Sequence, residues 1–225
     1  MKRPTFLLSV VLLVGGGTLF AQDSVDYFPA QQGRSWTYTL TLTANGKQKK
    51  IEYTTKVERK EEISGKSCAV FVSRSAERLL KQEWYSVDDG KVMSAQQKGG
   101  VRPPQVFQNR VLFVRKALEA FKGTEEKKPS WTWSCNDGST GTVTLERRER
   151  VFVPKIGDFR SCVVILDRGV FHTGKGDKKT IARTTDHTLW LAPDLGLVKE
   201  TVVIKKPDGK VTFSTEAVLT KFQTP

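Results

Sequence analysis

Residues 190–200, WLAPDLGLVKE, are the stretch on which the predicted fold depends. An apolar segment leads into a Pro-Asp-x-Gly turn, and a second apolar segment follows, which predicts a β-hairpin corner carrying a large aromatic side chain. Residues 84–92, WYSVDDGKV, have the same skeleton: in both stretches a Gly follows the Trp by six residues and a Val follows that Gly by two. The recurrence indicates a β protein built from two related halves.

Two further anchors recur in the same order. Residues 36–38 (WTY) correspond to residues 131–133 (WTW), and residues 68–72 (CAVFV) correspond to residues 162–166 (CVVIL). The two anchors start 32 residues apart in the first half and 31 apart in the second. Matched order and spacing favour an internal duplication. We therefore expect a first β lobe over residues 22–122 and a second, repeated lobe over residues 123–225.

The amino terminus has the pattern of a secretory signal peptide. Lys2 and Arg3 precede an apolar run, and Ala21 offers a small residue for cleavage, so residues 1–21 are expected to be removed. The run is too short for a comfortable membrane span. We expect the mature chain to be exported and soluble, in the periplasm or outside the cell, with no transmembrane segment.

The chain is strongly basic. It has 37 Lys and Arg against 24 Asp and Glu, a net charge of +13, which becomes +11 (35 − 24) without Lys2 and Arg3. Such an excess favours anionic partners: lipid headgroups, lipoproteins or anionic cell-surface polymers. Alternatively, the lysines only keep solvated strand faces soluble. Nucleic acid is not expected as a partner because an exported protein seldom meets it, and the oligomeric state is left open.

Strands separated by tight turns dominate the chain. Trp36, Tyr38, Leu40 and Leu42 alternate with threonines, as in a half-buried strand. Residues 68–72 are continuously apolar, which predicts a strand buried on both faces. Only residues 115–122 (RKALEAFK) have helical spacing. Because no crossover helices fit between the strands, the fold class expected is all-β, with two duplicated antiparallel meander sheets and one short linking helix.

The three cysteines leave two alternatives open. An exported protein can form disulfides, and an odd count leaves at least one thiol unpaired. Cys135 and Cys162 lie in the same half and are the favoured pair. Equally, Cys68 and the other two are interpreted as small buried hydrophobic residues.

A search for catalytic and metal-binding patterns is negative. His187 follows Asp186 on a predicted strand, so the two side chains point to opposite faces and do not pair. No Cys or His spacing is typical of a metal site. Strand carboxylates such as Glu58 and Glu149 have basic neighbours, which predicts cross-strand ion pairs on a solvated face. We expect no enzyme activity, no catalytic residue, no metal and no cofactor.

Two groups of residues are candidate ligand contacts. The segment GKGDKK at 174–179 is interpreted either as a plain hairpin tip or as an anion contact through Lys175, Lys178 and Lys179. The tryptophans are interpreted either as core side chains or as the lining of an apolar ligand cavity. These are Trp36, Trp84, Trp131, Trp133 and Trp190.

Several of these segments together resemble a widespread group of exported bacterial β-rich proteins of unknown function, often labelled TapB-like. The resemblance rests on residues 28–38, 131–133, 153–162 and 190–199 and covers nearly the whole mature chain. It implies a half-open barrel similar to those of periplasmic lipoprotein carriers, in which a curved antiparallel sheet covers an apolar cavity. It implies no reaction and no catalytic residue.

The leading functional hypothesis is a non-catalytic exported protein that binds an apolar or anionic ligand of the cell envelope, such as a lipid or lipoprotein. The alternative is a structural or protein-interaction module without a ligand, and a hydrolase using strand carboxylates ranks third. A continuous apolar cavity favours the first, a filled core with a flat exposed patch the second, and paired buried carboxylates in a cleft the third.

Overall fold

The fold is taken from a computed structural model that describes residues 26–76, 78–88, 90–99, 104–173 and 180–225. The expected signal peptide and the segment 174–179, with Lys175, Lys178 and Lys179, lie outside the described residues. The elements are β1 (Ser35–Ala44), β2 (Lys47–Ile63), β3 (Lys66–Ser75), β4 (Arg78–Asp88), β5 (Lys91–Gly99), β6 (Gln105–Gln108), β7 (Val111–Val114), α1 (Arg115–Ala120), β8 (Ser130–Cys135), β9 (Thr140–Val153), β10 (Gly157–Thr173), β11 (Thr180–Ala192), β12 (Gly196–Lys205) and β13 (Val211–Gln223).

All strand pairs are antiparallel and belong to one sheet. Its order is β4-β3-β2-β1-β13-β12-β11-β10-β9-β8-β6-β5-β7, and β4 also pairs with β5, which closes the sheet into a barrel. Both β6 and β7 pair with β5, at different places along it, so the two short strands share one position in the ring.

The all-β prediction is confirmed, but the prediction of two separate, half-open meander sheets is wrong. Backbone hydrogen bonds between β1 and β13, and between β6 and β8, join the two halves of the chain. The pairing of β4 with β5 joins the two edges that an open half-barrel would expose. The boundary expected at residue 122 falls just after α1, within this single sheet, and the division into lobes stays a prediction.

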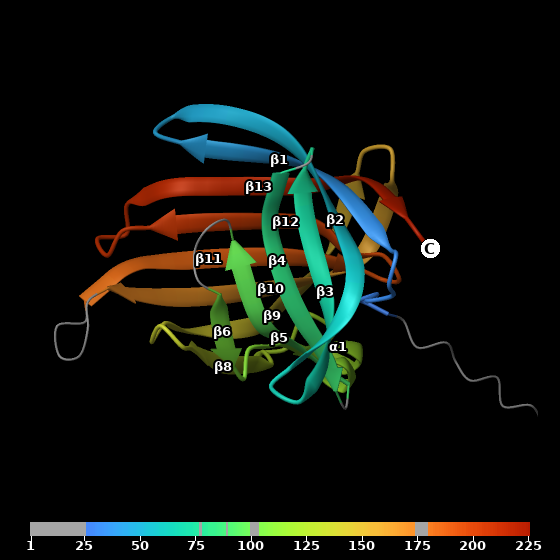
Figure 1. Ribbon diagram of the computed structural model, residues 1–225, viewed down its shortest axis with the longest axis horizontal. Helices are drawn as coiled ribbons and strands as arrows, with labels where there is room; N and C mark the ends of the chain where they lie inside the picture. The colour runs from blue at the N-terminus through green and yellow to red at the C-terminus, as the bar shows by residue number, and fades with distance from the viewer. Residues whose placement is uncertain (1–25, 77, 89, 100–103, 174–179) are drawn as a thin grey trace, which may run out of the picture.

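The barrel is flattened. In Figure 1, β9–β13 run side by side in one layer, and β3–β5 cross in front of them. The long strand β2 curves from the first layer into the second, and its register with β3 shifts between Val57 and Arg59. A register shift of this kind bends a strand and increases its twist, which allows β2 to serve both layers.

One end of the barrel is filled by the corner between β11 and β12, which is the centre of the WLAPDLGLVKE stretch. The indole of Trp36 donates a 2.8 Å hydrogen bond to the carbonyl of Leu195, and the hydroxyl of Tyr38 donates one of 2.9 Å to the carbonyl of Leu197. Asp26 and Asp194 exchange two hydrogen bonds at the same corner. The stretch is therefore an anchor for β1 and for the start of the described chain.

The helix α1 begins at Arg115, as predicted, and ends two residues earlier than expected. Leu118 is buried within the helix, and Phe121, three residues later, is buried just beyond the end of the helix. Both belong to the same interior cluster as Leu145 of β9. Arg148 fixes the helix by donating to the carbonyls of Leu118 and Phe121.

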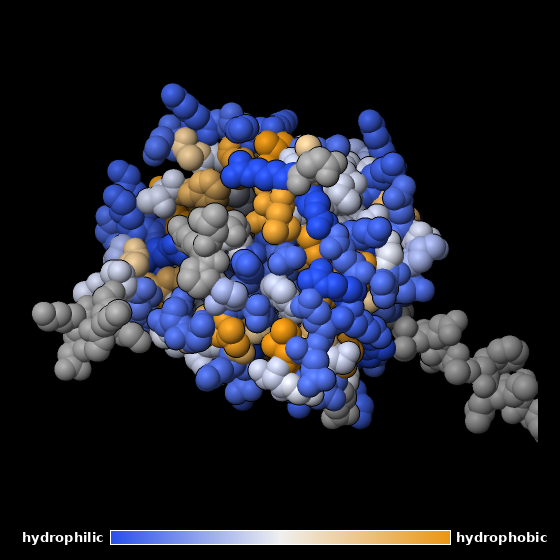
Figure 2. All heavy atoms as spheres, viewed as in Figure 1, coloured by the Kyte–Doolittle hydropathy of each residue, from blue (hydrophilic) through white to orange (hydrophobic). Residues whose placement is uncertain are grey.

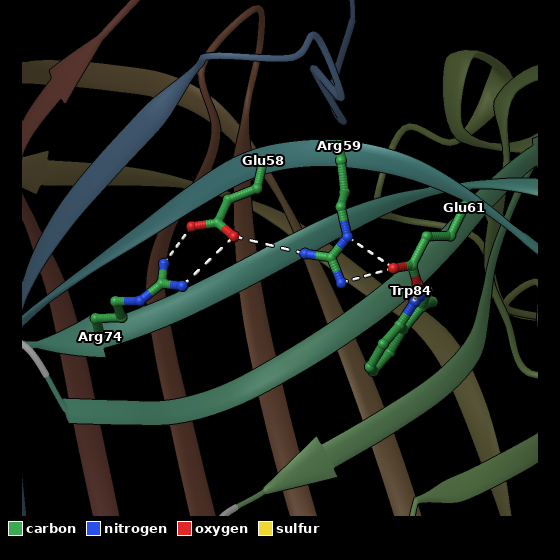
Figure 3. A network of polar contacts seen from close by, with 5 residues as sticks. All are labelled: Glu58, Arg59, Glu61, Arg74 and Trp84. Atoms are coloured by element: carbon green, nitrogen blue, oxygen red, sulfur yellow. Dashed lines mark hydrogen bonds and ion pairs between the residues drawn. The ribbon is translucent and has the colours of Figure 1, made fainter.

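The predicted burial of residues 68–72 on both faces is confirmed. Phe71 points into the barrel, whereas Cys68, Val70 and Val72 form a cluster of their own with Trp84. The indole of Trp84 donates to Glu61, which also binds Arg59. Figure 3 shows how this chain of polar contacts continues to Glu58 and Arg74. Ion pairs of this kind match the solvated cross-strand pairs expected for Glu58.

The same arrangement occurs a second time around Trp190. Trp84 lies directly opposite Val70, and Trp190 lies directly opposite Val164. The indole of Trp190 donates to Glu149, as that of Trp84 donates to Glu61. In each case the glutamate that accepts from the indole lies opposite the cysteine at the start of the apolar run. Glu61 pairs with Cys68, and Glu149 pairs with Cys162. The repeated residues thus hold equivalent places in the sheet.

The favoured disulfide between Cys135 and Cys162 is not present. All three thiols are free and buried. The physical reason is that they pack in different places: Cys135, Cys162 and Cys68 each belong to a different hydrophobic cluster. The other interpretation, three small buried hydrophobic residues, describes them.

Candidate functional site

The interior of the barrel is polar along part of its length. Lys81, Glu83 and Tyr85 occupy every second position of β4 and point into the barrel. Glu200 of β12 points in from the opposite layer. Charged side chains at inward positions are uncommon in a filled core, because burying a charge has a large cost unless it is paired.

These side chains line three hollows that adjoin one another. An open outer hollow of about 630 Å³ lies between β5, β6, β8 and β11. It shares Gln97, Gln105 and Arg183 with a polar chamber of about 220 Å³ inside the barrel. The chamber shares Lys81, Glu83 and Glu200 with an aromatic end of only about 80 Å³, where Trp36, Tyr38 and Phe71 fill most of the space. The accessible part of the interior is therefore polar and close to the outer hollow.

Glu200 is held in its charged form at the inner side of the chamber. Burial alone would raise its pKa, but the charge of Lys81 and the contact with His187 bring the pKa down from 4.5 to about 2. His187 Nε2 lies 3.1 Å from a Glu200 oxygen, without the alignment of a hydrogen bond.

Lys81 sits between two carboxylates. Burial would lower its pKa, but Glu83 and Glu200 raise the pKa well above its ordinary value, so the ammonium group stays charged. Its nitrogen lies 3.0 Å from a Glu83 oxygen. Glu83 also accepts a 3.1 Å hydrogen bond from the hydroxyl of Tyr85. The acids on this side of the chamber are thus already paired.

A second charged group lies on the other wall of the chamber. Asp167 of β10 is 3% exposed and pairs with Arg110 at 2.6 Å. Its other oxygen accepts a 2.8 Å hydrogen bond from the indole of Trp133. Arg110 also lies over the ring of Phe107, 4.2 Å from its centroid. This arrangement satisfies both carboxylate oxygens and fixes the Trp133 ring.

Two glycines make room for that ring. Trp133 lies directly opposite Gly141, which in turn lies opposite Gly169 on the next strand. A Cβ at Gly141 would come within 2.4 Å of the Trp133 ring and 2.3 Å of the Arg168 carbonyl oxygen. The wall of the chamber is therefore a flat indole resting on bare backbone.

Arg183 differs from Lys81 and Arg110 in its contacts. It lies over the ring of its cross-strand neighbour Phe171, 4.7 Å from the centroid. Its Nε is buried and has no hydrogen-bond partner among the described residues. Arg183 lines both the outer hollow and the chamber at their junction, together with the amides of Gln97 and Gln105. The Gln105 amide nitrogen donates a 3.0 Å hydrogen bond to Asp137, which lines the outer hollow.

The structure separates the tryptophans that were candidate ligand contacts. Trp133 lines the polar chamber and Trp36 lines the aromatic end. Trp131 packs partly buried against the interior cluster of Trp133. Trp84 and Trp190 line none of the three hollows, although Trp190 belongs to the same hydrophobic cluster as Trp36. Two of the five tryptophans thus line hollows, and the role of the tryptophans as ligand contacts stays a prediction.

Sequence reasoning missed the charged side chains of the chamber. The available signal was a charge at a strand position whose neighbours in the same register are apolar. Glu200 stands at every second position with Val198, Val202 and Ile204, so a regular strand places all four on one face. Asp167 stands in the same way with Val163 and Ile165. Such a charge, at a position expected to face inward, marks either a bulge or a polar interior.

Asp186 and His187 are neighbours in the chain but contact different residues. Asp186 and His187 do point to opposite faces: Asp186 pairs with Lys205, while His187 contacts Glu200 inside the barrel. Within the described ranges, no cluster of three or more His, Cys, Asp or Glu side chains is arranged to hold a metal ion. No helix in the same ranges has the length and apolar character needed to cross a membrane.

Comparison with known proteins identifies similar solved structures. No protein-family model and no curated protein matches this chain. One similar solved structure is a protein described as exported, with a YmcC-like fold, from Bacteroides fragilis NCTC 9343, at 14% identity and TM-score 0.49, covering 89% of this chain and 100% of that one. Another is described as a lipoprotein of Parabacteroides distasonis ATCC 8503, at 13% identity and TM-score 0.43, covering 90% and 100%. The TapB-like resemblance stays a prediction.

Proposed function

We propose that this chain is an exported, non-catalytic binding protein whose barrel takes up a small anionic ligand with an apolar part. The observation that carries the proposal is the guanidinium group of Arg183, stacked on Phe171, with a buried Nε that no described residue satisfies. A buried donor without a partner is costly, and an anionic group at this position would remove that cost.

The remaining groups at the junction support an anion with a short apolar part. The amide of Gln97 adds a donor beside Arg183, and Phe171, Val202 and Ile204 supply apolar surface in the chamber. A long acyl chain does not fit this interior, because the aromatic end offers only about 80 Å³. The ligand class is therefore narrower than the lipid or lipoprotein first expected.

A binding role also agrees with the state of the chamber acids. A general acid at neutral pH needs a raised pKa, but the pKa of Glu200 is lowered to about 2. Asp167 has both oxygens engaged by Arg110 and Trp133. The paired carboxylates that would favour a hydrolase are thus occupied in holding the fold.

A matched pair of probes tests the proposal. Octanoate and octanol have the same chain and differ in the carboxylate, so thermal unfolding of the mature protein is followed in the presence of each. We expect octanoate to raise the midpoint in a concentration-dependent way and octanol to leave it unchanged. Equal shifts with both probes would show that the site does not select for charge, and no shift with either would remove the interior as a binding site for this ligand class.

A further inference from the structure

Two hairpins of the barrel project from the same side, and the free ends of both are rich in lysine. In Figure 1 the β1–β2 and β12–β13 connections lie at the left, on the side where β10 ends and β11 begins. Register brings the two hairpins together, because Ala44 at the end of β1 pairs with both Lys47 of β2 and Phe213 of β13. We define the basic end by the exposed side chains Lys47, Lys49, Lys50, Lys206 and Lys210.

Acidic residues do little to neutralise this surface. Between Lys205 and Val211 the only carboxylate is Asp208, and between Lys47 and Ile51 there is none. Asp208 accepts a hydrogen bond from the backbone of Lys210 and serves the turn itself. Figure 2 shows hydrophilic residues over the free end of the β1–β2 hairpin. Within these two spans, five exposed lysines thus stand against one carboxylate, and the next exposed acid along β2 is Glu52.

Two apolar side chains are exposed at the same end. Val211, the first residue of β13, is 53% exposed, and Ile181, the second residue of β11, is 47% exposed. Both lie toward the same end of the sheet, since Thr184, three residues after Ile181, pairs with Lys205, and Lys205 pairs with Val211. Apolar side chains among lysines are typical of surfaces that meet a lipid headgroup region, where the charges bind anionic lipid and the apolar groups enter the boundary.

We propose that the basic end docks on an anionic lipid bilayer. Charge complementarity supplies the long-range attraction, and the two apolar side chains distinguish a bilayer from a soluble polyanion, which would not bury them. Arg183 follows Ile181 by two residues on the same strand, so docking brings the junction of the outer hollow and the chamber close to the lipid surface. The inference is independent of the proposed ligand, because it rests on different residues.

Co-sedimentation of the mature protein with vesicles tests the docking. The probes are vesicles of phosphatidylcholine alone and vesicles with phosphatidylglycerol added. Each lysine near an anionic surface contributes roughly fivefold to partitioning, so replacing all five lysines of the basic end with Gln is expected to lower partitioning on anionic vesicles at least about 100-fold. Neutral vesicles are expected to bind neither protein.

A matched control carries the same change in net charge elsewhere. Lys60, Lys66, Lys91, Lys116 and Lys122 are also exposed, and their replacement with Gln is expected to change partitioning less than about tenfold. Equal losses in the two variants would overturn the proposal, since net charge alone would then explain binding. Retained binding in the basic-end variant would overturn it as well.

The apolar residues provide a second, independent measurement. The double variant Ile181→Ser, Val211→Ser keeps every lysine, so we expect weaker vesicle binding with unchanged salt-dependent retention on heparin. If the variant binds vesicles as the unchanged protein does, the surface is a general polyanion site and the bilayer proposal fails. Circular dichroism and thermal unfolding of all variants verify that each is folded.

Discussion

Arg183 of β11 lies directly opposite Phe171 of β10 and covers its ring, with the guanidinium carbon 4.7 Å from the ring centroid. Stacking on an aromatic face holds a guanidinium group in place while leaving its in-plane N–H donors open. The buried Nε has no partner within the described chain. A positively charged group that is fixed, partly buried and incompletely bonded is a suitable contact for an anionic ligand.

The lowered pKa of Glu200 predicts how the stability of the folded protein depends on pH. In the unfolded chain its pKa is near 4.5, and in the folded protein Lys81 and His187 hold it at about 2. Below pH 4.5 the unfolded state therefore binds a proton that the folded state does not, so stability falls as the pH drops from 4.5 towards 2. The loss is on the order of 3 kcal/mol at full titration, from about 1.36 kcal/mol per pKa unit.

Urea unfolding between pH 7 and pH 2 measures this effect. The variant Glu200→Gln is expected to be less stable at pH 7 and to lose less stability on acidification than the unchanged protein. Glu216→Gln is the control, since Glu216 forms a surface pair with Lys199 and is 49% exposed. A pH profile of Glu200→Gln that parallels that of the unchanged protein would contradict the role given to Glu200.

Asp167 predicts a large stability difference between two Asp-to-Asn variants. Asp167→Asn leaves Arg110 buried without a full counter-charge, so we expect a loss of about 3 kcal/mol. Asp186→Asn removes a half-exposed surface pair with Lys205 and is expected to cost less than about 1 kcal/mol. Chemical unfolding monitored by tryptophan emission compares them. Equal losses would show that the Asp167 pair is not specially stabilising.

Gly141 predicts a steric limit in the chamber wall. Gly141→Ala would place a methyl group within 2.4 Å of the Trp133 ring and against a backbone carbonyl oxygen. We expect destabilisation of about 2–3 kcal/mol and a shift in tryptophan emission as the ring moves. Gly99→Ala is the control, because its nearest atom would be 3.9 Å away. Unchanged stability in Gly141→Ala would contradict the close packing of Trp133 on β9.

The three cysteines predict slow thiol chemistry. Burial, with a smaller effect of Glu149, raises the pKa of Cys162 to about 12, and burial also raises the pKa of Cys68 and Cys135. Since the thiolate is the reactive form, a thiol reagent at pH 8 is expected to label the native protein slowly and all three thiols in urea. Labelling of only one thiol in urea without reductant would indicate a disulfide.

Local sequence patterns predicted most of the strands but not how the sheet closes. Alternation identified the β1 face with Trp36 and Tyr38. The β1–β2 turn falls at Asn45-Gly46, a pair that favours such turns, and both residues have positive φ. Closure depends on pairing β1 with β13 and β4 with β5. The first of these contacts joins the two ends of the chain, and periodicity within a strand carries no information about such distant partners.

The candidate site was less predictable than the fold. The tryptophans were candidates because they are large aromatics, but Trp84 and Trp190 line none of the three hollows. The residues of the junction, Arg183 and Gln97 among them, come from strands far apart in sequence. Which face of β11 points inward is set by tertiary pairing, so the sequence alone left Arg183 among many basic strand residues.

The measurement that tests the binding proposal most directly is calorimetric titration of octanoate into the mature protein and two Arg-to-Gln variants. A hydrogen bond to a charged group contributes about 1.5–3 kcal/mol, so Arg183→Gln is expected to weaken octanoate binding by roughly 10- to 100-fold. Arg168→Gln, on the neighbouring strand with a side chain 70% exposed, is expected to bind as the unchanged protein does. Equal affinity in Arg183→Gln and the unchanged protein would contradict the assignment of Arg183 as the anion contact.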